Sequence, residues 1–297
     1  MEKRLIVIIG PTAVGKTHLA IRIAQHYKTE IISADSRQIY RELNIGTAKP
    51  VTKELQEVKH HFINCRSIQD DYDAGQFGRE ARTVVDLLFQ NHDQVVMCGG
   101  SGLYIKSLVE GFDDLPGVSP EIRAKIIAAY DEKGLAWLQE EVAMNDPDYF
   151  RVVDKRNPQR LMRALEIINS TGKKFSGFLR KEKITLPFEV VKIGLELDRK
   201  ELYHRIDQRM DRMIEDGLFE EAERFFELRH LNSLQTVGYQ EAFEFFGGVI
   251  DREEAIRLMK RNSRHYAKRQ LTWFKKDKAI HWFHPDDMDG VLKFLCE

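Results

Sequence analysis

The chain has 297 residues, of which 42% are hydrophobic and 31% are charged, and its formal net charge is −1. This size suits an α/β core with a second, smaller unit, while the near-zero charge excludes a uniformly basic protein, so any nucleic-acid surface requires cations segregated on one face. No apolar run approaches the roughly 20 residues that span a membrane, and the first residues do not resemble a signal peptide.

The first predicted elements are a strand, a glycine-rich loop and a helix. The apolar run Leu5–Ile9 predicts a buried parallel strand, and the apolar residues among 20–24 indicate one face of a helix. Between them, Gly10–Thr17 matches the phosphate-binding pattern GxxxxGK[ST] in the strand–loop–helix context that the pattern requires. We therefore expect the loop to bind a di- or triphosphate, with Lys16 neutralising its charge and Thr17 binding Mg²⁺.

The chain continues as alternating strands and helices. Apolar runs predict strands at Glu30–Ala34 and Gln94–Cys98, with a helix at Gly75–Phe89 between them. Repeated strand–helix units favour a parallel sheet covered by helices on both faces, with ligands at the carboxyl ends of its strands. The phosphate loop, Asp35 and the Gly99–Gly100 turn each follow a strand, so we expect them to meet along one edge.

A turn-rich segment at Gly111–Gly117 interrupts this alternation. From Pro120 to about Thr171, apolar residues recur at helical spacing, which predicts a helical insertion. Val190–Leu197 then predicts a return to the sheet. Further helices are predicted at 202–216, 219–228, 239–246 and 252–274.

Polar residues after two of the strands are candidates for chemistry. From its position alone, the Asp35 carboxylate could hold Mg²⁺ through water, act as a general base, or cap a turn. Gly99–Tyr104 forms a second glycine-rich turn, where Ser101 could donate to a phosphate or a base, or simply belong to a tight turn.

Two predicted helices carry cations on one face. Asn157 and Pro158 are typical first residues of a helix. Arg160 and Arg163 follow on one side of it, which suits either a phosphate or a solvated face paired with acids.

In the predicted helix at 252–274, five cations share a face beside aromatic residues, as in nucleic-acid binders. They are Arg257, Lys260, Arg261, Arg264 and Lys268.

Seven motifs occur in an order that resembles one enzyme family. They are Gly10–Thr17, Asp35–Arg41, Gly46–Pro50, Gly99–Tyr104, Arg156–Arg160, Val237–Tyr239 and Tyr266–Trp273. From the first strand to Trp273, the chain closely resembles the bacterial tRNA dimethylallyltransferases, also called tRNA isopentenyltransferases. Two departures are mild: Ser101 stands where the family usually has threonine, and Leu234–Thr236 is only loosely family-like.

The resemblance implies a P-loop NTPase-like α/β core, with a parallel sheet flanked by helices. This core would comprise residues 1–115 and 187–297, including carboxyl-terminal tRNA-binding helices, and a helical insertion domain at 116–186 would grip the anticodon stem-loop. The implied reaction transfers a dimethylallyl group from dimethylallyl diphosphate to N6 of adenosine 37 in tRNA, giving N6-isopentenyladenosine and diphosphate, with Mg²⁺ as cofactor.

The resemblance also assigns roles to residues. Asp35 would be the general base, a role worth roughly 10²- to 10⁴-fold in rate. Lys16 and Thr17 would stabilise the departing diphosphate, Thr17 as metal ligand, and Ser101 completes the expected catalytic set. The expected donor-binding residues are Gly10, Pro11, Thr12, Ala13, Val14, Gly15, Lys16 and Thr17. The expected tRNA-binding residues are Asp35, Ser36, Arg37, Gln38, Ser101, Arg123, Gln159, Arg160, Leu161, Met162, Arg163, Thr236, Val237, Gly238, Tyr239 and Gln240.

Three other functions stay open. A small-molecule kinase would share the phosphate loop, an adenylate isopentenyltransferase would use a free nucleotide as acceptor, and a non-catalytic module would only bind RNA. The basic face at 257–268 argues against the second, and Lys16, Thr17 and Asp35 argue against the third. We expect a cytoplasmic monomer with reduced cysteines, and with neither a membrane nor a required protein partner.

Overall fold

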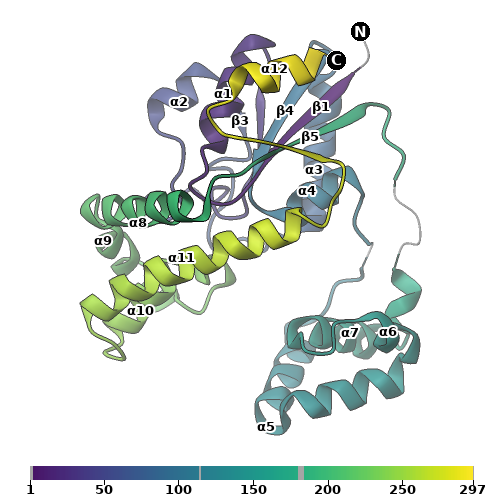
Figure 1. Ribbon diagram of the computed structural model, residues 1–297. Coiled ribbons are helices and arrows are strands. Elements are labelled where there is room, and N and C mark those ends of the chain that lie inside the picture. The colour runs from purple at the N-terminus through teal and green to yellow at the C-terminus, as the bar shows by residue number, and fades with distance from the viewer. Residues whose placement is uncertain (1–2, 114, 180–183, 297) are drawn as a thin grey trace. The chain divides into compact units, whose positions relative to one another are not determined.

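The computed structural model describes residues 3–113, 115–179 and 184–296. Within these ranges, six strands form one sheet in the order β3-β2-β4-β1-β5-β6, and neighbouring strands pair in parallel (Figure 1). The strands are Arg4–Ile9 (β1), Ile31–Ala34 (β2), His60–His61 (β3), Gln94–Gly99 (β4), Glu189–Leu195 (β5) and Ile280–Phe283 (β6). Because β1 pairs with β4 on one side and β5 on the other, the loop that follows β1 leaves the middle of the carboxyl edge.

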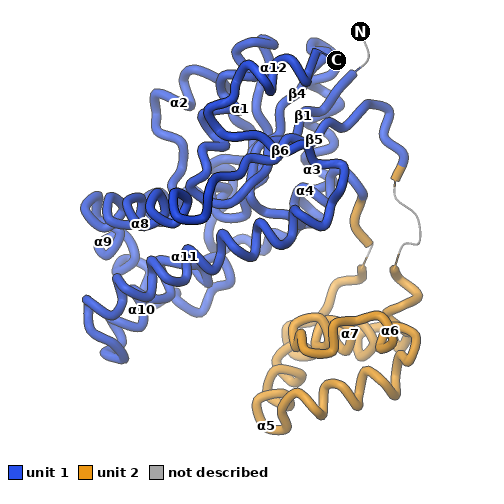
Figure 2. Tube along the Cα trace, in the orientation of Figure 1, with its two compact units in different colours: residues 1–110, 185–297 blue, residues 111–184 orange. Residues whose placement is uncertain are grey.

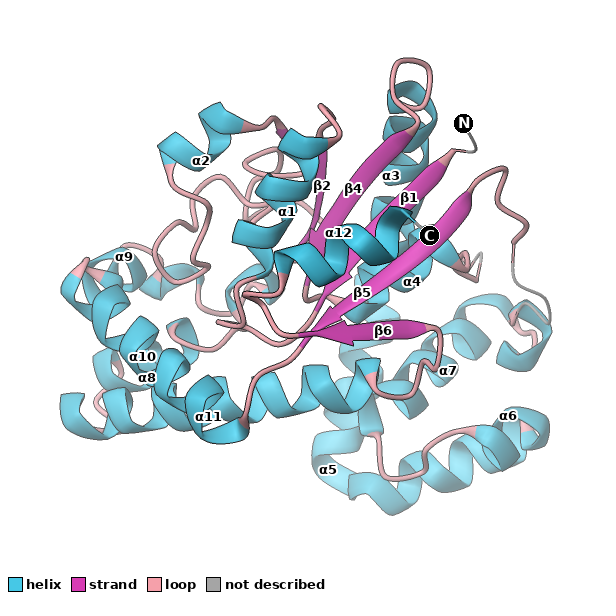
Figure 3. Ribbon diagram, turned by 45° about the horizontal axis from the view of Figure 1, so that its top comes forward, coloured by secondary structure: helices cyan, strands magenta, loops and turns pink. Residues whose placement is uncertain are grey.

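Helices cover both faces of this sheet (Figure 3). Successive side chains of a strand point to opposite faces. The helices of this part of the chain are Lys16–His26 (α1), Thr52–Glu57 (α2), Ala74–Leu88 (α3), Gly102–Val109 (α4), Arg199–Glu215 (α8), Leu218–Glu223 (α9), Tyr239–Phe246 (α10), Arg252–Phe274 (α11) and Met288–Cys296 (α12). Ile6 and Ile8 of β1 accordingly pack with α1, α8 and α12, whereas Leu5 and Val7 pack with α3 and α4.

A helical layer supports the segment that follows β2. Helices α9, α10 and α11 share one apolar cluster with Ile39 and Leu43. This packing anchors the chain between Asp35 and Ala48, which carries several of the expected site residues. Helix α11 also packs beside α8 (Figure 1).

The chain divides into two compact units, 1–110 with 185–297 and 111–184 (Figure 2). The second unit contains helices Pro120–Asn145 (α5), Pro147–Val152 (α6) and Pro158–Thr171 (α7), with a 3₁₀ turn at Phe175–Phe178. Buried Asp146 accepts hydrogen bonds from the backbone N–H of Tyr149 and of Ser176, at 3.1 and 2.7 Å. One carboxylate therefore caps α6 and holds the 3₁₀ turn, beside an apolar core formed mainly by α5 and α7.

Some elements differ from the sequence prediction. The helix predicted at 219–228 is wrong in its second half: α9 ends at Glu223, and Phe226–Leu228 forms a 3₁₀ turn whose Phe226 ring packs against α10. The sequence pattern does not reveal β3, which consists of two histidines, or α2, which buries none of its residues. No helix in the described ranges is both long and apolar enough to cross a membrane.

Candidate active site

The loop Gly10–Thr17 joins β1 to α1 through backbone angles that favour small residues. The angle φ is +64° at Ala13 and +104° at Gly15, the residue before α1. A Cβ atom at Gly10 would lie 2.7 Å from the carbonyl oxygen of Leu195, which explains the glycine there. No described side chain caps α1 at this end, so the first N–H groups of the helix are available to an anionic ligand.

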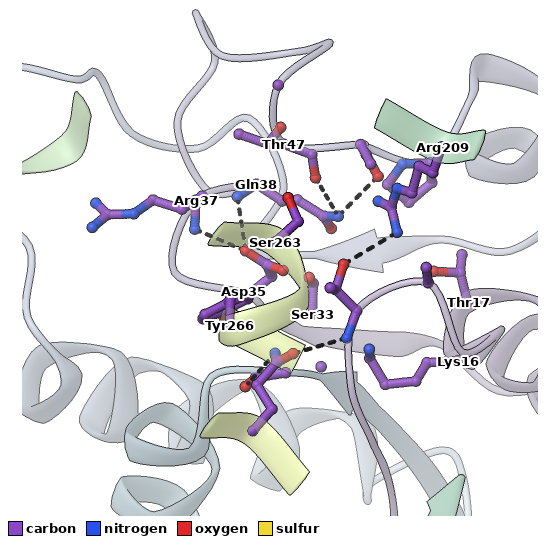
Figure 4. Close-up of a pocket in the computed structure, with 18 of the residues that line it drawn as sticks. Lys16, Thr17, Ser33, Asp35, Arg37, Gln38, Thr47, Arg209, Ser263 and Tyr266 are labelled. Atoms are coloured by element: carbon purple, nitrogen blue, oxygen red, sulfur yellow. Dashed lines mark hydrogen bonds between the residues drawn. The ribbon is translucent and has the colours of Figure 1, made fainter. Parts of the chain in front are cut away.

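The phosphate loop borders a cavity of about 770 Å³ (Figure 4). Its walls come from the loop, the segments after β2 and β4, helices α8 and α11, and the segment 235–240, all within the first unit. The expected site residues that line it are Thr12, Ala13, Gly15, Lys16, Thr17, Asp35, Ser36, Arg37, Gln38, Thr236, Val237 and Gln240. Gly10, Pro11 and Val14 lie behind this wall, all three buried.

Lys16 lies at the phosphate-loop side of the cavity. Its Nζ donates a hydrogen bond to the carbonyl oxygen of Pro11 at 2.7 Å. Burial, with the nearby Arg209 guanidinium, lowers the pKa of Lys16 to about 8, although the Asp35 carboxylate favours its charged form. Burial also raises the pKa of Cys98 to about 12, so this thiol stays neutral.

Asp35 follows β2 and faces the same cavity (Figure 4). Its Oδ1 accepts hydrogen bonds from the backbone N–H groups of Arg37 and Gln38, at 2.9 and 3.3 Å. In the described part of the chain, the other oxygen, Oδ2, accepts none. The carboxylate is therefore fixed through one oxygen and keeps the second for a ligand or a proton.

Ser101 holds the turn after β4 against the turn after β2. Its Oγ accepts a hydrogen bond from the backbone N–H of Ser36 at 2.9 Å and lies 3.2 Å from the Ser36 hydroxyl. Its own N–H donates to the carbonyl oxygen of Ala34 at 3.2 Å. The predicted meeting of these two turns is confirmed, whereas Ser101 itself is not among the residues that line the cavity.

The side-chain amide of Gln38 has a fixed orientation. Its Nε2 donates to the carbonyl oxygens of Thr47 and Ala48, at 3.2 and 3.1 Å (Figure 4). Because both partners are acceptors, the nitrogen must point at them. No described donor satisfies the side-chain oxygen Oε1, so Gln38 can offer the cavity a hydrogen-bond acceptor.

Arg37 uses its guanidinium within the protein. It donates to the carbonyl oxygens of Asn232, Ser233 and Gln235, at 3.0, 3.1 and 3.3 Å. These bonds attach the segment before α10 to the turn after β2. The Arg37 side chain therefore has a structural role in addition to the tRNA-binding role that the sequence predicts.

The segment 236–240 reaches the cavity through three residues only. They are Thr236, Val237 and Gln240. Gly238 is buried with φ of +97°. The Tyr239 ring is fully buried and its hydroxyl donates to Glu221 at 2.5 Å, so the side chain has a structural role and the expected tRNA contact would have to involve the backbone.

Three arginines of α8 are functional candidates that the motifs do not reveal. Arg205, Arg209 and Arg212 line the cavity. Nη1 of Arg209 lies 3.4 Å from Oγ1 of Thr12, and burial lowers the pKa of Arg209. Their spacing of four and three residues places them on one helical face, and this spacing is the signal that could have found them.

Gln270 of α11 connects the phosphate loop to the turn after β4. Its Oε1 accepts a hydrogen bond from the Thr12 N–H at 2.8 Å, and its Nε2 donates to the Gly100 carbonyl at 3.0 Å. The side chain is buried. A residue 258 positions further along the chain thus holds the phosphate loop in place.

We expect Gln270→Leu to lower the free energy of unfolding by about 1–3 kcal/mol, because it leaves a backbone donor and acceptor without partners. The loosened loop should also bind a diphosphate more weakly. Urea denaturation and titration with inorganic diphosphate measure the two effects. Gln208→Leu, at an exposed site on α8, should change stability by less than about 0.5 kcal/mol. Equal behaviour of the two variants would contradict this role of Gln270.

The second unit presents some of its expected tRNA-binding residues to solvent. Arg123, Gln159 and Arg160 are exposed, whereas Arg163 is partly buried. Arg163 pairs with buried Glu166 at 3.0 Å, and Arg123 lies 3.8 Å from the same carboxylate. The side chains of Leu161 and Met162 belong to the core of this unit, so any contact of these two residues with tRNA would have to involve the backbone.

The basic face expected on α11 is not continuous. Lys260 and Arg264 pair at 2.5 Å with Asp211 and Asp207 of α8. Arg257 pairs with Glu254 of its own helix at 2.6 Å. The expectation of one unbroken basic stripe is therefore wrong, since acids of α8 offset much of its charge.

The parallel strand order and the phosphate loop at its centre place the chain among the P-loop NTPase-like α/β proteins. The cavity beside that loop combines a lysine and arginines with a free carboxylate oxygen, so it can bind a phosphate group and accept a proton. The chain belongs to the IPP transferase family, whose model matches residues 38–277. It is therefore an enzyme, and both the resemblance and the fold class inferred from the sequence are confirmed.

Named relatives cover nearly the whole chain. The tRNA dimethylallyltransferase of Cytophaga hutchinsonii is 48% identical, over 99% of this chain and 97% of its own. That of Christiangramia forsetii is 50% identical, over 97% and 95%. The solved tRNA isopentenylpyrophosphate transferase of Bacillus halodurans is 33% identical with a TM-score of 0.73, covering 100% of this chain and 96% of its own. A eukaryotic dimethylallyltransferase acting on tRNA has a TM-score of 0.79 at 27% identity, over 97% and 75%.

Proposed function

We propose that the chain transfers a dimethylallyl group from dimethylallyl diphosphate to N6 of adenosine 37 in the anticodon loop of tRNA. The observation that carries this proposal is the presence, in one cavity, of a phosphate loop and of the Asp35 carboxylate with a free oxygen. The first can bind the leaving group and the second can accept the proton of the acceptor amine. The relatives, which are tRNA dimethylallyltransferases, support the same reaction.

The donor diphosphate fits the phosphate-loop side of the cavity. Departure of diphosphate leaves cationic character on C1 of the allyl group, so the main electrostatic task is to stabilise the departing negative charge. Lys16, Arg209 and the amino terminus of α1 supply positive charge and N–H donors there. The gain is large because these groups lie in a partly buried site, where charges are poorly screened.

Mg²⁺ fits this site as a metal that accompanies the donor. No cluster of three or more His, Cys, Asp or Glu side chains in the described ranges could hold a metal. Mg²⁺ commonly binds through one or two protein oxygens together with substrate phosphates and waters. Thr17, which lines the cavity at the start of α1, would hold it. When bound, the metal would supply further charge neutralisation to the diphosphate.

The acceptor base would lie between Asp35 and Gln38. The N6 nitrogen forms a bond to C1 of the allyl group, the C1–O bond breaks, and its electron pair leaves with the diphosphate. The proton lost from N6 passes to Oδ2 of Asp35, the oxygen that no described donor occupies. Oε1 of Gln38 would accept the other N–H of the amine. The base has to leave its stack to reach this cavity, as in other enzymes that modify bases.

The second unit would hold the anticodon stem-loop. Its exposed cations Arg123 and Arg160 are suited to backbone phosphates, and Arg163 follows Arg160 by one helical turn and shares Glu166 with Arg123. Thr236, Val237 and Gln240 would add contacts at the cavity itself. An adenylate isopentenyltransferase would need none of the contacts in the second unit.

We expect a stem-loop with unmodified adenosine 37 to be prenylated in strong preference to AMP. The logarithm of its affinity should fall linearly with the logarithm of salt concentration, with a slope of roughly −0.7 to −0.9 per phosphate contacted. Arg160→Ala should reduce that slope by about one without changing donor affinity. Fluorescence anisotropy at several salt concentrations measures the slope, and mass spectrometry detects the product.

Arg151→Ala is the matched control, because Arg151 is an exposed arginine of the same unit that pairs with Asp148. It should leave the slope unchanged. Efficient prenylation of AMP, with the stem-loop ignored, would overturn the tRNA proposal while keeping the prenyl chemistry. Phosphate transfer from ATP to a small acceptor, without need of a prenyl donor, would instead support a kinase.

A further inference from the structure

Glu221 of α9 has a buried carboxylate whose hydrogen-bonding capacity is fully used. Its Oε2 accepts from the backbone N–H groups of Asn44 and Ile45, both at 3.0 Å. Its Oε1 accepts from the Gly46 N–H at 3.0 Å and from the Tyr239 hydroxyl at 2.5 Å. Only 6% of the residue is exposed, and it does not line the cavity. All four partners are donors, so they require a carboxylate at this position.

The turn that Glu221 holds is the one that orients Gln38. Within it, the Ala48 N–H donates to the Ile45 carbonyl at 2.9 Å, and the Thr47 hydroxyl donates to the Leu43 carbonyl at 3.0 Å. The next two carbonyls, of Thr47 and Ala48, accept both hydrogen bonds from Nε2 of Gln38. A continuous series of hydrogen bonds therefore runs from buried Glu221, through the turn 44–48, to the amide of Gln38 in the cavity.

This series is separate from the contacts that hold the phosphate loop. The loop is fixed by the bond from Lys16 to Pro11 and by the bond from Thr12 to Gln270. None of the groups bonded to Glu221 belongs to that loop. A change at Glu221 should therefore reach the acceptor side of the cavity and leave the donor side intact.

We infer that Glu221 is a positioning residue for recognition of the acceptor base. By holding the turn 44–48, it keeps the nitrogen of the Gln38 amide on two carbonyls and leaves the oxygen to meet an exocyclic amine. The inference rests on the proposed function, because an amino-bearing base is the ligand that this oxygen would select. It also gives the Tyr239 hydroxyl a role, namely to complete the donors around Glu221.

The first test compares Glu221→Gln with Glu220→Gln. The glutamine at 221 has nearly the same shape but directs an NH₂ group at donors, whereas Glu220 is an exposed neighbour on α9. We expect Glu221→Gln to lower kcat/KM for an anticodon stem-loop by roughly 10- to 100-fold, the effect of leaving buried donors unsatisfied. Its dissociation constant for inorganic diphosphate should stay within about twofold of wild type. Glu220→Gln should match wild type in both measurements.

The second test is a double-mutant cycle with Gln38→Ala. If Glu221 acts through Gln38, the double variant should be no slower with the stem-loop than Gln38→Ala alone. A merely structural role would multiply the two losses. Tyr239→Phe removes a single donor to Glu221, so its loss of kcat/KM should be smaller and should likewise not multiply with that of Gln38→Ala. It replaces Glu221→Gln in the cycle if thermal denaturation shows that Glu221→Gln does not fold.

The outcomes separate the inference from the proposed function. The positioning role would be overturned if the losses of Glu221→Gln and Gln38→Ala multiplied in the double variant. It would also be overturned if Glu221→Gln lost as much diphosphate affinity as kcat/KM. In either case, prenyl transfer by the wild-type enzyme would still uphold the proposed function. A wild-type enzyme that transfers no prenyl group to any adenosine-containing stem-loop would overturn both.

Discussion

Asp35→Asn should slow the chemical step by roughly 10²- to 10⁴-fold, the usual contribution of a general base. Asparagine can keep an oxygen on the N–H groups of Arg37 and Gln38, so the turn should survive. It replaces the free carboxylate oxygen with an NH₂ group, which cannot accept a proton from N6. Donor affinity should stay close to wild type, because the loss arises only once the amine attacks. Single-turnover kinetics at saturating donor and stem-loop measure the step directly.

Asp73→Asn provides the matched control for this variant. Asp73 caps α3 by accepting a hydrogen bond from the Gln76 N–H at 2.8 Å, and it does not line the cavity. Replacing the Asp73 carboxylate with an amide should therefore leave the rate of the chemical step at the wild-type value. A normal rate in Asp35→Asn would restrict Asp35 to capping its turn.

Lys16→Ala should weaken binding of the donor diphosphate by roughly 10- to 100-fold, because a charge-assisted hydrogen bond contributes about 1.5–3 kcal/mol. The pH dependence is a second readout on the same side chain. With a pKa of about 8 in the free enzyme, Lys16 is protonated below that pH and loses its charge above it. Donor affinity should thus be level up to about pH 8 and fall by as much as tenfold per unit beyond it. Isothermal titration with dimethylallyl diphosphate between pH 6.5 and 9.5 measures both effects.

In Lys16→Ala the part of this pH dependence that arises above pH 8 should disappear. Lys53→Ala, at an exposed position on α2, should retain both the affinity and the pH profile of wild type. If Lys16→Ala bound the donor as tightly as wild type at pH 7, the phosphate-loop assignment would be contradicted.

The sequence predicts those elements whose signal is local. The apolar run of β1 and the glycine pattern after it depend on neighbouring residues only, and the structure has both where they are expected. The same holds for α10 and α11, whose observed ends match the predicted ranges. β6 and α12 were not predicted, although their buried residues Ile280, Val291 and Leu295 complete the core beside β5 and β1.

The site shows where local reasoning stops. Motifs locate the phosphate loop and Asp35, because the residues of each motif act together over a few positions. The partners of Gln270 and Glu221 are set by tertiary packing, at separations of 258 and 175 to 177 positions. The same limit explains the error over α11, since the aspartates that neutralise Lys260 and Arg264 come from α8. Cations that share a helix face can be counted from sequence, but the acids packed against them cannot.

The bond from Thr12 to Gln270 also has a consequence for biosynthesis. The phosphate loop is made well before the side chain that fixes it, because 258 positions separate Thr12 from Gln270. The central strand β1 also lacks one of its two neighbours until β5 has been made, because Arg4 of β1 is in register with Glu189 of β5. Contacts between such distant positions slow folding. A nascent or truncated chain that ends before α11 should therefore have its phosphate-loop sequence complete and yet bind no donor, so donor binding begins only after α11 has been made.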